Sequence, residues 1–224
     1  MQEQVVLRAA TDADADRLAD FLNTCTLAYQ AVARSSPAEA RAQLYDDGTD
    51  PAVDTRLALV QDEIVGFARV WAASDEELRI YARTHPAATG TGIGSALLAF
   101  CEGRARELAP ERPRKLTTTT WAADERAPEL LTGFGFAPVR YFLQMRIASD
   151  EIRVRPEWPD GVHVEPFSEG GVEDDALYGA WREAFAGHWG HADQGAARFW
   201  EERRKPDRDV SLRLVAVVRR SGRG

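Results

Sequence analysis

Residues 90–95, Gly-Thr-Gly-Ile-Gly-Ser, have the types and spacing of an anion-binding loop. A strand-like alternation over residues 78–84 precedes them, and apolar residues at helical spacing follow from Ile93 to Leu108. Glycines let the backbone approach a bulky group closely, and the N–H groups in the first turn of a helix lack partners within that helix. This order of elements predicts a phosphate-binding site, with a diphosphate as the expected ligand. A glycine-rich turn that only leads into a helix is the alternative.

The glycine spacing differs from that of two common nucleotide-binding loops. Gly90, Gly92 and Gly94 do not follow the Gly-x-Gly-x-x-Gly pattern of dinucleotide-binding folds, although Ser95 could stand in for the third glycine. A dinucleotide-binding fold also begins its repeating strand–helix units with the glycine loop, whereas in this chain the loop begins only at residue 90. No Gly-Lys-Ser/Thr follows, which excludes a P-loop. An enzyme with a nucleotide cofactor therefore stays a minor alternative.

Residues 84–98 resemble the acyl-CoA loop of the GNAT superfamily of N-acyltransferases, which commonly reads His-Pro-x-x-Arg-Gly-x-Gly-Ile-Gly-Ser-Ala-Leu-Leu. From His85 this chain reads His-Pro-Ala-Ala-Thr-Gly-Thr-Gly-Ile-Gly-Ser-Ala-Leu-Leu. Thr89 replaces the usual arginine or glutamine, and Thr91 replaces a frequent arginine. The loop therefore lacks side-chain charge, and we expect its backbone N–H groups to bind the phosphates.

The resemblance also implies which residues bind acetyl-CoA, the acyl-donor cosubstrate. Main-chain groups at the end of the preceding strand would pair with the pantetheine amides, and the loop would bind the diphosphate. The implied binding residues are Ala82, Arg83, Thr84, Thr89, Gly90, Thr91, Gly92, Ile93, Gly94 and Ser95. No metal site is expected, because no cluster of side chains has the spacing of metal ligands.

The order of predicted elements matches the same family over residues 1–149. The pattern predicts strands at 4–8, 56–60, 64–71, 78–84 and 115–121, helices beginning near Thr11, Ser36, Ile93 and Asp124, and a long half-buried strand over 139–147. The predicted fold class is α/β, an α+β arrangement around one mixed sheet, in the form of the GNAT acyltransferase fold.

A partial second GNAT-like repeat is predicted after this domain. Residues 150–161 contain prolines and a glycine that mark a linker. Residues 162–224 then repeat the first strand, helices and second strand at a matched separation, without a second glycine loop. The linker, and residues 185–191 after it, resemble tandem proteins of the mycothiol synthase type. The expected arrangement is a tandem one with an incomplete second domain.

The candidate catalytic residues are less well defined than the loop. Glu76 and Glu77 precede the loop strand, and a carboxylate there could take a proton from an attacking amine. An exposed acidic turn at residues 74–77 is the alternative. Tyr141 and Tyr81 are candidates to protonate the departing thiolate, a role that solvent could also fill.

Position 131 departs from the family pattern. Residues 133–136, Gly-Phe-Gly-Phe, resemble the turn that ends the last major GNAT helix, with Gly135 in the left-handed conformation and Phe136 as its apolar contact. Many members of the family place a tyrosine four residues before this glycine, and its hydroxyl protonates the CoA thiolate. Leu131 occupies that position and cannot donate a proton.

The expected function is transfer of an acetyl group from acetyl-CoA to a primary amine of a small molecule. The alternative is a noncatalytic acyl-CoA-binding module, the remnant of a tandem acetyltransferase, which Leu131 favours. The net charge of −8 argues against nonspecific nucleic-acid binding. We expect a cytoplasmic protein without membrane contact, because no signal peptide or membrane-spanning run is recognisable. A homodimer through the second unit is possible, since that unit has a marginal core.

Overall fold

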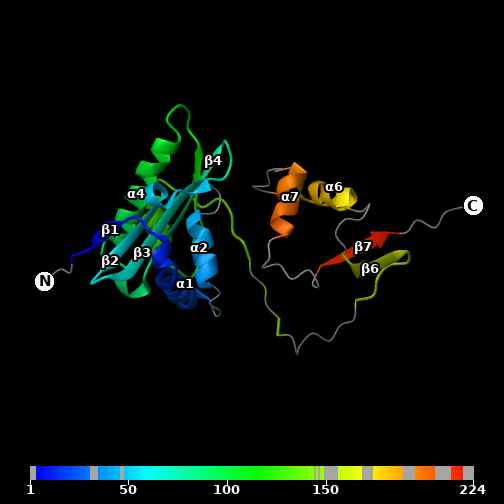
Figure 1. Cartoon of the computed structure of the whole chain (residues 1–224), viewed down its shortest axis with the longest axis horizontal. Helices are drawn as coiled ribbons and strands as arrows, with labels where there is room; N and C mark the ends of the chain where they lie inside the picture. The colour runs from blue at the N-terminus through cyan, green and yellow to red at the C-terminus, as the bar shows by residue number, and fades with distance from the viewer. Residues whose placement is uncertain are drawn as a thin grey trace, which may run out of the picture. The chain divides into compact units, whose positions relative to one another are not determined.

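The computed structural model describes residues 4–30, 35–45, 48–143, 145, 147–148, 156–167, 174–188, 195–204 and 213–218. The chain divides into two compact units, Met1–Phe142 and Leu143–Gly224 (Figure 1), and each is described by itself. The division falls before the end of the predicted first domain at residue 149. Much of the predicted linker over residues 150–161 lies outside the described residues. In the part of the chain that the structure describes, no helix has the length and apolar character needed to cross a membrane.

A five-stranded mixed sheet forms the centre of the first unit. Its strands, in spatial order, are β1 (Val6–Arg8), β2 (Thr55–Val60), β3 (Glu63–Ala72), β4 (Glu77–Thr84) and β5 (Lys115–Thr117). Neighbouring strands run antiparallel except β4 and β5, which run parallel. The five strands predicted between residues 4 and 121 and the mixed sheet are confirmed here, although β5 ends before the predicted residue 121.

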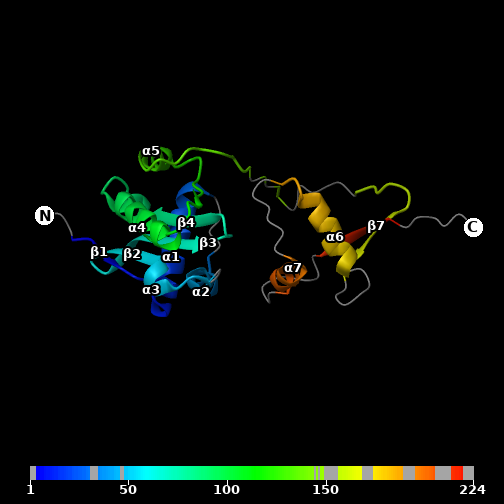
Figure 2. The same ribbon diagram turned by 90° about the horizontal axis from the view of Figure 1, so that it is seen from above.

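Helices cover both faces of this sheet (Figure 2). In chain order they are the 3-10 turn η1 (Asp12–Asp14), α1 (Ala15–Tyr29), α2 (Pro37–Tyr45), α3 (Pro51–Asp54), the 3-10 turn η3 (Pro86–Ala88), α4 (Ile93–Leu108) and α5 (Arg126–Gly133). Leu57 of β2 packs with α1 and Ala58 packs with α4, because successive strand residues point to opposite faces. The unit therefore has two apolar cores, one on each face.

A network of polar contacts fixes the start of α1. Thr11 donates its backbone N–H (2.9 Å) and its hydroxyl (2.8 Å) to the Asp14 carboxylate. Arg8 of β1 donates two hydrogen bonds to the same carboxylate, at 2.8 and 2.6 Å. The Arg8 hydrogen bond is the main cause that lowers the pKa of Asp14 from 3.8 to about 2, against the opposing effect of burial. Asp14 therefore joins β1 to α1.

We expect acid to weaken this join. Because the pKa of Asp14 is lower in the folded than in the unfolded chain, its contribution is full above pH 4 and is lost as the pH falls to about 2. The shift corresponds to about 2 kcal/mol of unfolding free energy. The measurement is the unfolding free energy of wild type and Asp14→Asn across this range. As the pH falls, the unfolding free energy of Asp14→Asn should decrease less steeply than that of wild type. Asp12→Asn, at an exposed carboxylate, is the control. Equal slopes for Asp14→Asn and wild type would contradict the assignment.

The strand predicted over residues 139–147 is not found at the residues of this range that the structure describes. Its described residues belong to no strand, and their side chains are exposed, from 62% for Phe142 to 94% for Met145. Alternation of apolar and polar residues is a local signal, but a strand also needs a paired neighbour. β5 is only three residues long, and the sheet has no strand beyond it in the part of the chain that is described.

The second unit contains the predicted short elements. They are β6 (Val162–Pro166), α6 (Asp174–Phe185), α7 (Gly195–Arg203) and β7 (Leu214–Val218). β6 and β7 pair antiparallel, with Val164 opposite Ala216. Aromatic rings of the two helices pack on one another: the Trp181 and Phe199 ring centroids lie 4.9 Å apart. The helices thus share a small aromatic core.

Candidate functional site

The glycine loop adopts the conformation that its composition predicts. Gly90 and Gly92 have φ angles of +84° and +89°, in the left-handed region that favours glycine. Gly92 is the N-cap of α4, and the first helical hydrogen bond runs from the Ala96 N–H to the Gly92 carbonyl at 3.0 Å. The N–H groups of the first turn consequently have no acceptor within the helix. Apart from Gly92 and its chain neighbours, no atom lies within 4 Å of a Cβ built on Gly92, so a ligand has room there.

Gly94 is required for a different reason. A Cβ at this position would stand 2.9 Å from Leu130 Cδ2 of α5 and 3.4 Å from the Thr84 hydroxyl oxygen. α5 therefore packs directly against the first turn of α4. This contact brings the start of α5 to the glycine loop, and a Cβ on Gly90 would lie 3.0 Å from Arg126 Nη1.

β4 and β5 separate beside the loop. They pair only from Glu77 opposite Lys115 to Arg79 opposite Thr117. β4 continues to Thr84, where it is paired with Gly66 of β3 alone. The edge of β4 that faces β5 is therefore free of strand pairing over residues 80–84. Main-chain groups at such an edge can pair with an extended ligand that carries amides. Two carbonyls there accept side-chain hydrogen bonds: that of Ala82 from Arg83 at 2.8 Å and that of Thr84 from Cys25.

An arginine and aromatic rings lie where the strands separate. The Arg83 guanidinium stands over the rings of Tyr81 and Trp121, at 4.2 and 4.3 Å from their centroids, and donates to the Thr119 carbonyl at 3.2 Å. Its Nε is buried and has no hydrogen-bond partner. The Tyr29 ring of α1 stacks on Trp121 at 5.2 Å. Arg83 thus bridges the two diverging segments through its side chain.

Two ionisable groups from α1 reach this region. The Cys25 thiol donates to the Thr84 carbonyl at 3.6 Å, and burial raises the pKa of Cys25 to about 12, so the group stays a thiol at neutral pH. Burial, followed by the nearby charge of Asp124, also raises the pKa of Tyr29. Both groups therefore remain protonated. Within the described residues, no cluster of three or more His, Cys, Asp or Glu side chains could hold a metal ion.

The predicted base candidates lie away from the loop. Glu76 is exposed in the turn before β4, and Glu77 is the first residue of that strand. Burial opposes ionisation of Glu77, but hydrogen bonds from Thr117 (2.6 Å) and Arg79 (3.1 Å) outweigh it and lower its pKa. Thr84 is seven residues further along β4, about 23 Å at the usual strand rise.

Among the described residues, the structure records no contact of Tyr141 with the loop. Tyr141 is 78% exposed and lies outside every helix and strand. The loop residues and Ala82, Arg83 and Thr84 are therefore brought together, whereas Glu76, Glu77 and Tyr141 are not. The catalytic roles of those three remain predictions.

The turn that ends α5 has the predicted form. Gly135 has a φ of +83°, and the N–H groups of Gly135 and Phe136 donate to the carbonyls of Thr132 (2.9 Å) and Leu131 (3.0 Å). Phe136 packs against the core on the α4 face, and so does Leu131. Leu131 is thus a packing residue in this chain.

An open cavity of about 460 Å³ lies along α5, lined by Arg126, Glu129, Leu130, Gly133 and Phe134. Leu130 is the residue that contacts Gly94, so the cavity is next to the glycine loop. The sequence patterns do not identify Arg126, Tyr29 and Trp121 as site residues. The one local signal nearby was Asp124, the predicted cap of α5, whose carboxylate accepts the Ala127 N–H at 3.2 Å.

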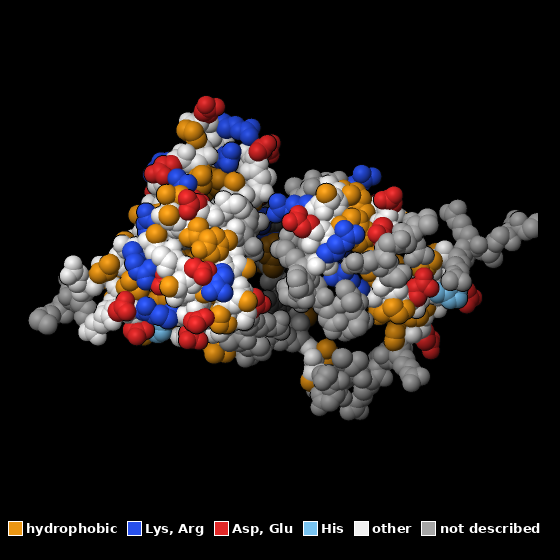
Figure 3. Space-filling view, in the orientation of Figure 1, with side chains coloured by type: hydrophobic (Ala, Val, Ile, Leu, Met, Phe, Trp, Pro, Cys, Tyr) orange, Lys and Arg blue, Asp and Glu red, His pale blue; other side chains and the backbone are white. Residues whose placement is uncertain are grey.

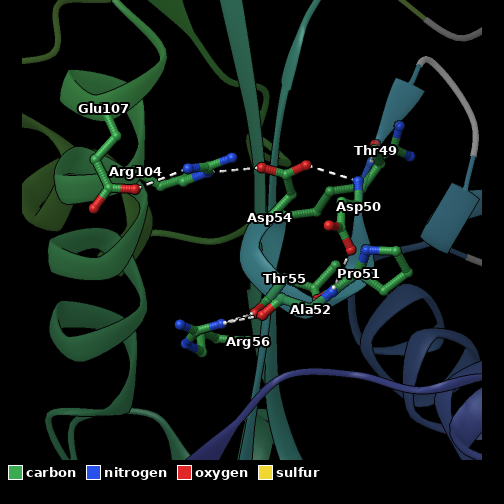
Figure 4. Close-up of polar contacts among 10 residues, drawn as sticks. Thr49, Asp50, Pro51, Ala52, Asp54, Thr55, Arg56, Arg104 and Glu107 are labelled. Carbon is green, nitrogen blue, oxygen red and sulfur yellow. Dashed lines mark hydrogen bonds and ion pairs between the residues drawn. The ribbon is translucent and has the colours of Figure 1, made fainter. Parts of the chain in front are cut away.

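A polar cluster anchors α4, which carries the loop (Figure 4). Arg104 donates to the Asp54 carboxylate at 2.7 Å and to Glu107 at 2.8 Å. The other Asp54 oxygen accepts the Asp50 N–H at 2.7 Å. The Arg104 and Asp54 side chains are only 19% and 8% exposed. This cluster joins α4 to α3 at the end of the helix remote from the loop.

The surface shows no broad field of one charge on the face in Figure 3. Acidic and basic side chains are interspersed over the first unit, despite the acidic excess of the whole chain. This face therefore offers no extended field of one sign to attract a charged ligand.

Comparisons with known proteins agree with this geometry. A family model described as an acetyltransferase (GNAT) domain matches residues 54–138. The mycothiol acetyltransferase of Paenarthrobacter aurescens (strain TC1) is 29% identical over 152 residues, which are 67% of this chain and 42% of that protein. The match therefore spans less than half of that relative's length.

Solved structures show the same fold. A GCN5-related N-acetyltransferase from Sphaerobacter thermophilus has a TM-score of 0.76 at 24% identity, over 96% of this chain and 67% of the other. A transcriptional regulator from Bacillus halodurans C-125 has a TM-score of 0.50 at 25% identity, over 64% of this chain and 100% of the other. Residues 54–138, with the loop, β4 and α5, thus match the model of a GNAT acetyltransferase domain, and the solved structures share the mixed-sheet fold.

Proposed function

We propose that this chain, which contains a GNAT acetyltransferase domain, transfers an acetyl group from acetyl-CoA to a primary amine of a small molecule. The observation that carries the proposal is the left-handed glycine loop at the start of α4, beside the unpaired edge of β4. The first offers N–H groups to a diphosphate, and the second offers main-chain groups to an extended chain of amides. Acetyl-CoA has a diphosphate, and an extended chain with amides follows it.

The residues present suit such a donor. Thr89 to Ser95 would hold the diphosphate, and Ala82, Arg83 and Thr84 would pair with the pantetheine amides. The open space at Gly92 leaves room for the phosphates. A backbone N–H near the end of β4 would polarise the thioester carbonyl, which favours the charge that develops on its oxygen.

The chemistry then needs two proton transfers. The amine nitrogen attacks the thioester carbon, the new C–N bond forms as the C–S bond breaks, the amine gives up a proton and the thiolate gains one. Glu76 and Glu77 remain our candidates for the base, and Tyr141 for the acid. For these roles, the three side chains must move from the positions described above toward the acetyl donor. Solvent is the alternative acid, since Leu131 cannot supply a proton.

A second candidate function is a noncatalytic acyl-CoA-binding module. Leu131 favours it, because the residue fills the core where many GNAT proteins place a tyrosine. The second unit also supports descent from a tandem acetyltransferase. It has the order strand, two helices, strand, with antiparallel strand pairing, as β1, α1, α2 and β2 have. We accordingly propose a partial second GNAT-like repeat that lacks an acyl-CoA loop.

We also propose a cellular location and an oligomeric state for this chain. The location is the cytoplasm, where acetyl-CoA and small amines are both available. The oligomeric state is a homodimer formed through the second unit. Its support is the two-stranded sheet, in which β6 and β7 each have one edge without a strand neighbour among the described residues.

One experiment separates the two functions. Purified protein is incubated with acetyl-CoA and a panel of primary amines, and thiol release is followed together with the mass of the acceptor. Calorimetry measures acetyl-CoA binding in parallel. We expect binding, and a gain of one acetyl group on at least one amine. Binding without transfer to any amine would favour the module, and no binding would contradict both functions.

A further inference from the structure

We propose that Arg126, at the start of α5, supplies the positive charge that the glycine loop lacks and binds the diphosphate of the donor. The proposal rests on acyl-CoA binding by the loop, and it adds a residue that the loop motif does not contain. The ligand group is the diphosphate of a nucleotide, and the α5 cavity beside Arg126 is the space for the attached nucleoside.

The loop itself presents no charged side chain. Thr89 and Thr91 stand where basic residues are frequent in similar loops. The Thr91 hydroxyl donates to the Ala88 carbonyl at 2.6 Å, so it is occupied in holding the loop together. Backbone N–H groups alone would then face a diphosphate with two negative charges. Phosphate sites commonly add a cation to such N–H groups.

Arg126 lies close enough to act as that cation. Its Nη1 is 3.0 Å from the position that a Gly90 Cβ would take, so the guanidinium lies against the left-handed part of the loop. The contact of Leu130 with Gly94, one turn along α5, holds the helix in this place. Arg126 thus approaches the loop from a different element, 36 residues after Gly90 in the chain.

No internal partner occupies the guanidinium. Arg126 is exposed, and in the part of the chain that the structure describes it makes no hydrogen bond or ion pair. Other basic residues near the sheet are engaged: Arg104 with Asp54 and Glu107, and Arg83 with two rings and two carbonyls. Arg126 can therefore bind an incoming anion without breaking a hydrogen bond or ion pair of the described residues.

The cavity indicates where the rest of the nucleotide would lie. Arg126 and Glu129 provide its charged part, and Leu130, Gly133 and Phe134 provide its apolar part. Such a mixture suits a nucleoside, whose base has an apolar face and polar edges. A phosphate at Arg126 would therefore join the loop on one side to the cavity on the other.

The test is calorimetry of the full chain with acetyl-CoA, for wild type and Arg126→Ala. We expect Arg126→Ala to weaken binding about tenfold or more, as the loss of a charge-assisted hydrogen bond does. The matched control is Arg106→Ala, which removes the same charge from an exposed arginine 13 residues along α4 from Ile93, about 20 Å from the loop. Its affinity should stay within twofold of wild type.

A second ligand identifies the phosphate that is bound. Dephospho-CoA keeps the diphosphate and lacks the 3′-phosphate, so Arg126→Ala should weaken its binding by the same factor. If the effect disappears with dephospho-CoA, the contact is to the 3′-phosphate and the assignment to the diphosphate is wrong. Unchanged affinity of Arg126→Ala, with binding lost in a loop variant, would overturn the inference and leave the proposed function standing. A wild-type protein that does not bind acetyl-CoA would overturn both.

Discussion

A Gly92→Glu variant loses at least a hundredfold in affinity for acetyl-CoA. Two effects combine at this residue. Its φ of +89° is costly for any side chain, and the carboxylate would stand in the space where the diphosphate is expected. Repulsion between charges a few ångströms apart is worth about 1 to 4 kcal/mol near a protein surface, and about 2.7 kcal/mol is a hundredfold. Calorimetry with acetyl-CoA measures the loss.

A matched control isolates the effect on the ligand. Gly48 also has a positive φ, +73°, and a Cβ built on it meets no atom within 4 Å. Gly48→Glu therefore introduces the same charge and a similar backbone strain away from the loop. We expect this variant to bind acetyl-CoA as wild type does. If Gly92→Glu folds and keeps full affinity, the loop does not bind the diphosphate.

An Asp54→Ala variant lowers the unfolding free energy of the first unit by about 3 kcal/mol. The substitution removes the carboxylate that pairs with Arg104 at 2.7 Å and accepts the Asp50 N–H. Both side chains are mostly buried, so Arg104 keeps only the exposed Glu107 as a partner and the Asp50 N–H loses its acceptor. Removing one partner of a buried ion pair costs more than the pair contributes when intact. Hydrogen exchange of the buried β3 amides measures the change, since it reports opening of this unit alone.

The control for Asp54→Ala is a surface pair on the same helix. Arg106 and Glu102 lie 2.5 Å apart with side chains 71% and 44% exposed. Such exposed pairs contribute less than about 0.5 kcal/mol, so Arg106→Ala should leave the exchange rates nearly unchanged. An equal effect of Asp54→Ala and Arg106→Ala would contradict the anchoring role that we assign to the Asp54 cluster.

The glycine loop could be predicted because its requirements are local. Positive φ angles at Gly90 and Gly92 and the cap at the start of α4 depend on residues adjacent in the chain. The same holds for the turn at Gly135, whose hydrogen bonds join positions within one turn of α5. Strand and helix order followed from apolar periodicity, which reflects the two faces of the sheet.

Residues brought together by packing could not be found in this way. Arg126 reaches Gly90 only because Leu130 packs on Gly94, a contact between two helices. Glu76 and Glu77 are near the loop strand in sequence, but the length of β4 separates them from its far end. The apolar alternation over residues 139–147 predicted a strand, yet pairing requires a neighbour that no local pattern specifies.

The measurement that tests the central claim most directly is a map of backbone amide chemical shifts with and without acetyl-CoA. Our account predicts the largest changes at Gly92, Ile93, Gly94 and Ser95, with further changes along residues 81–84. Changes confined to other parts of the chain, with these amides unaffected at saturation, would contradict it.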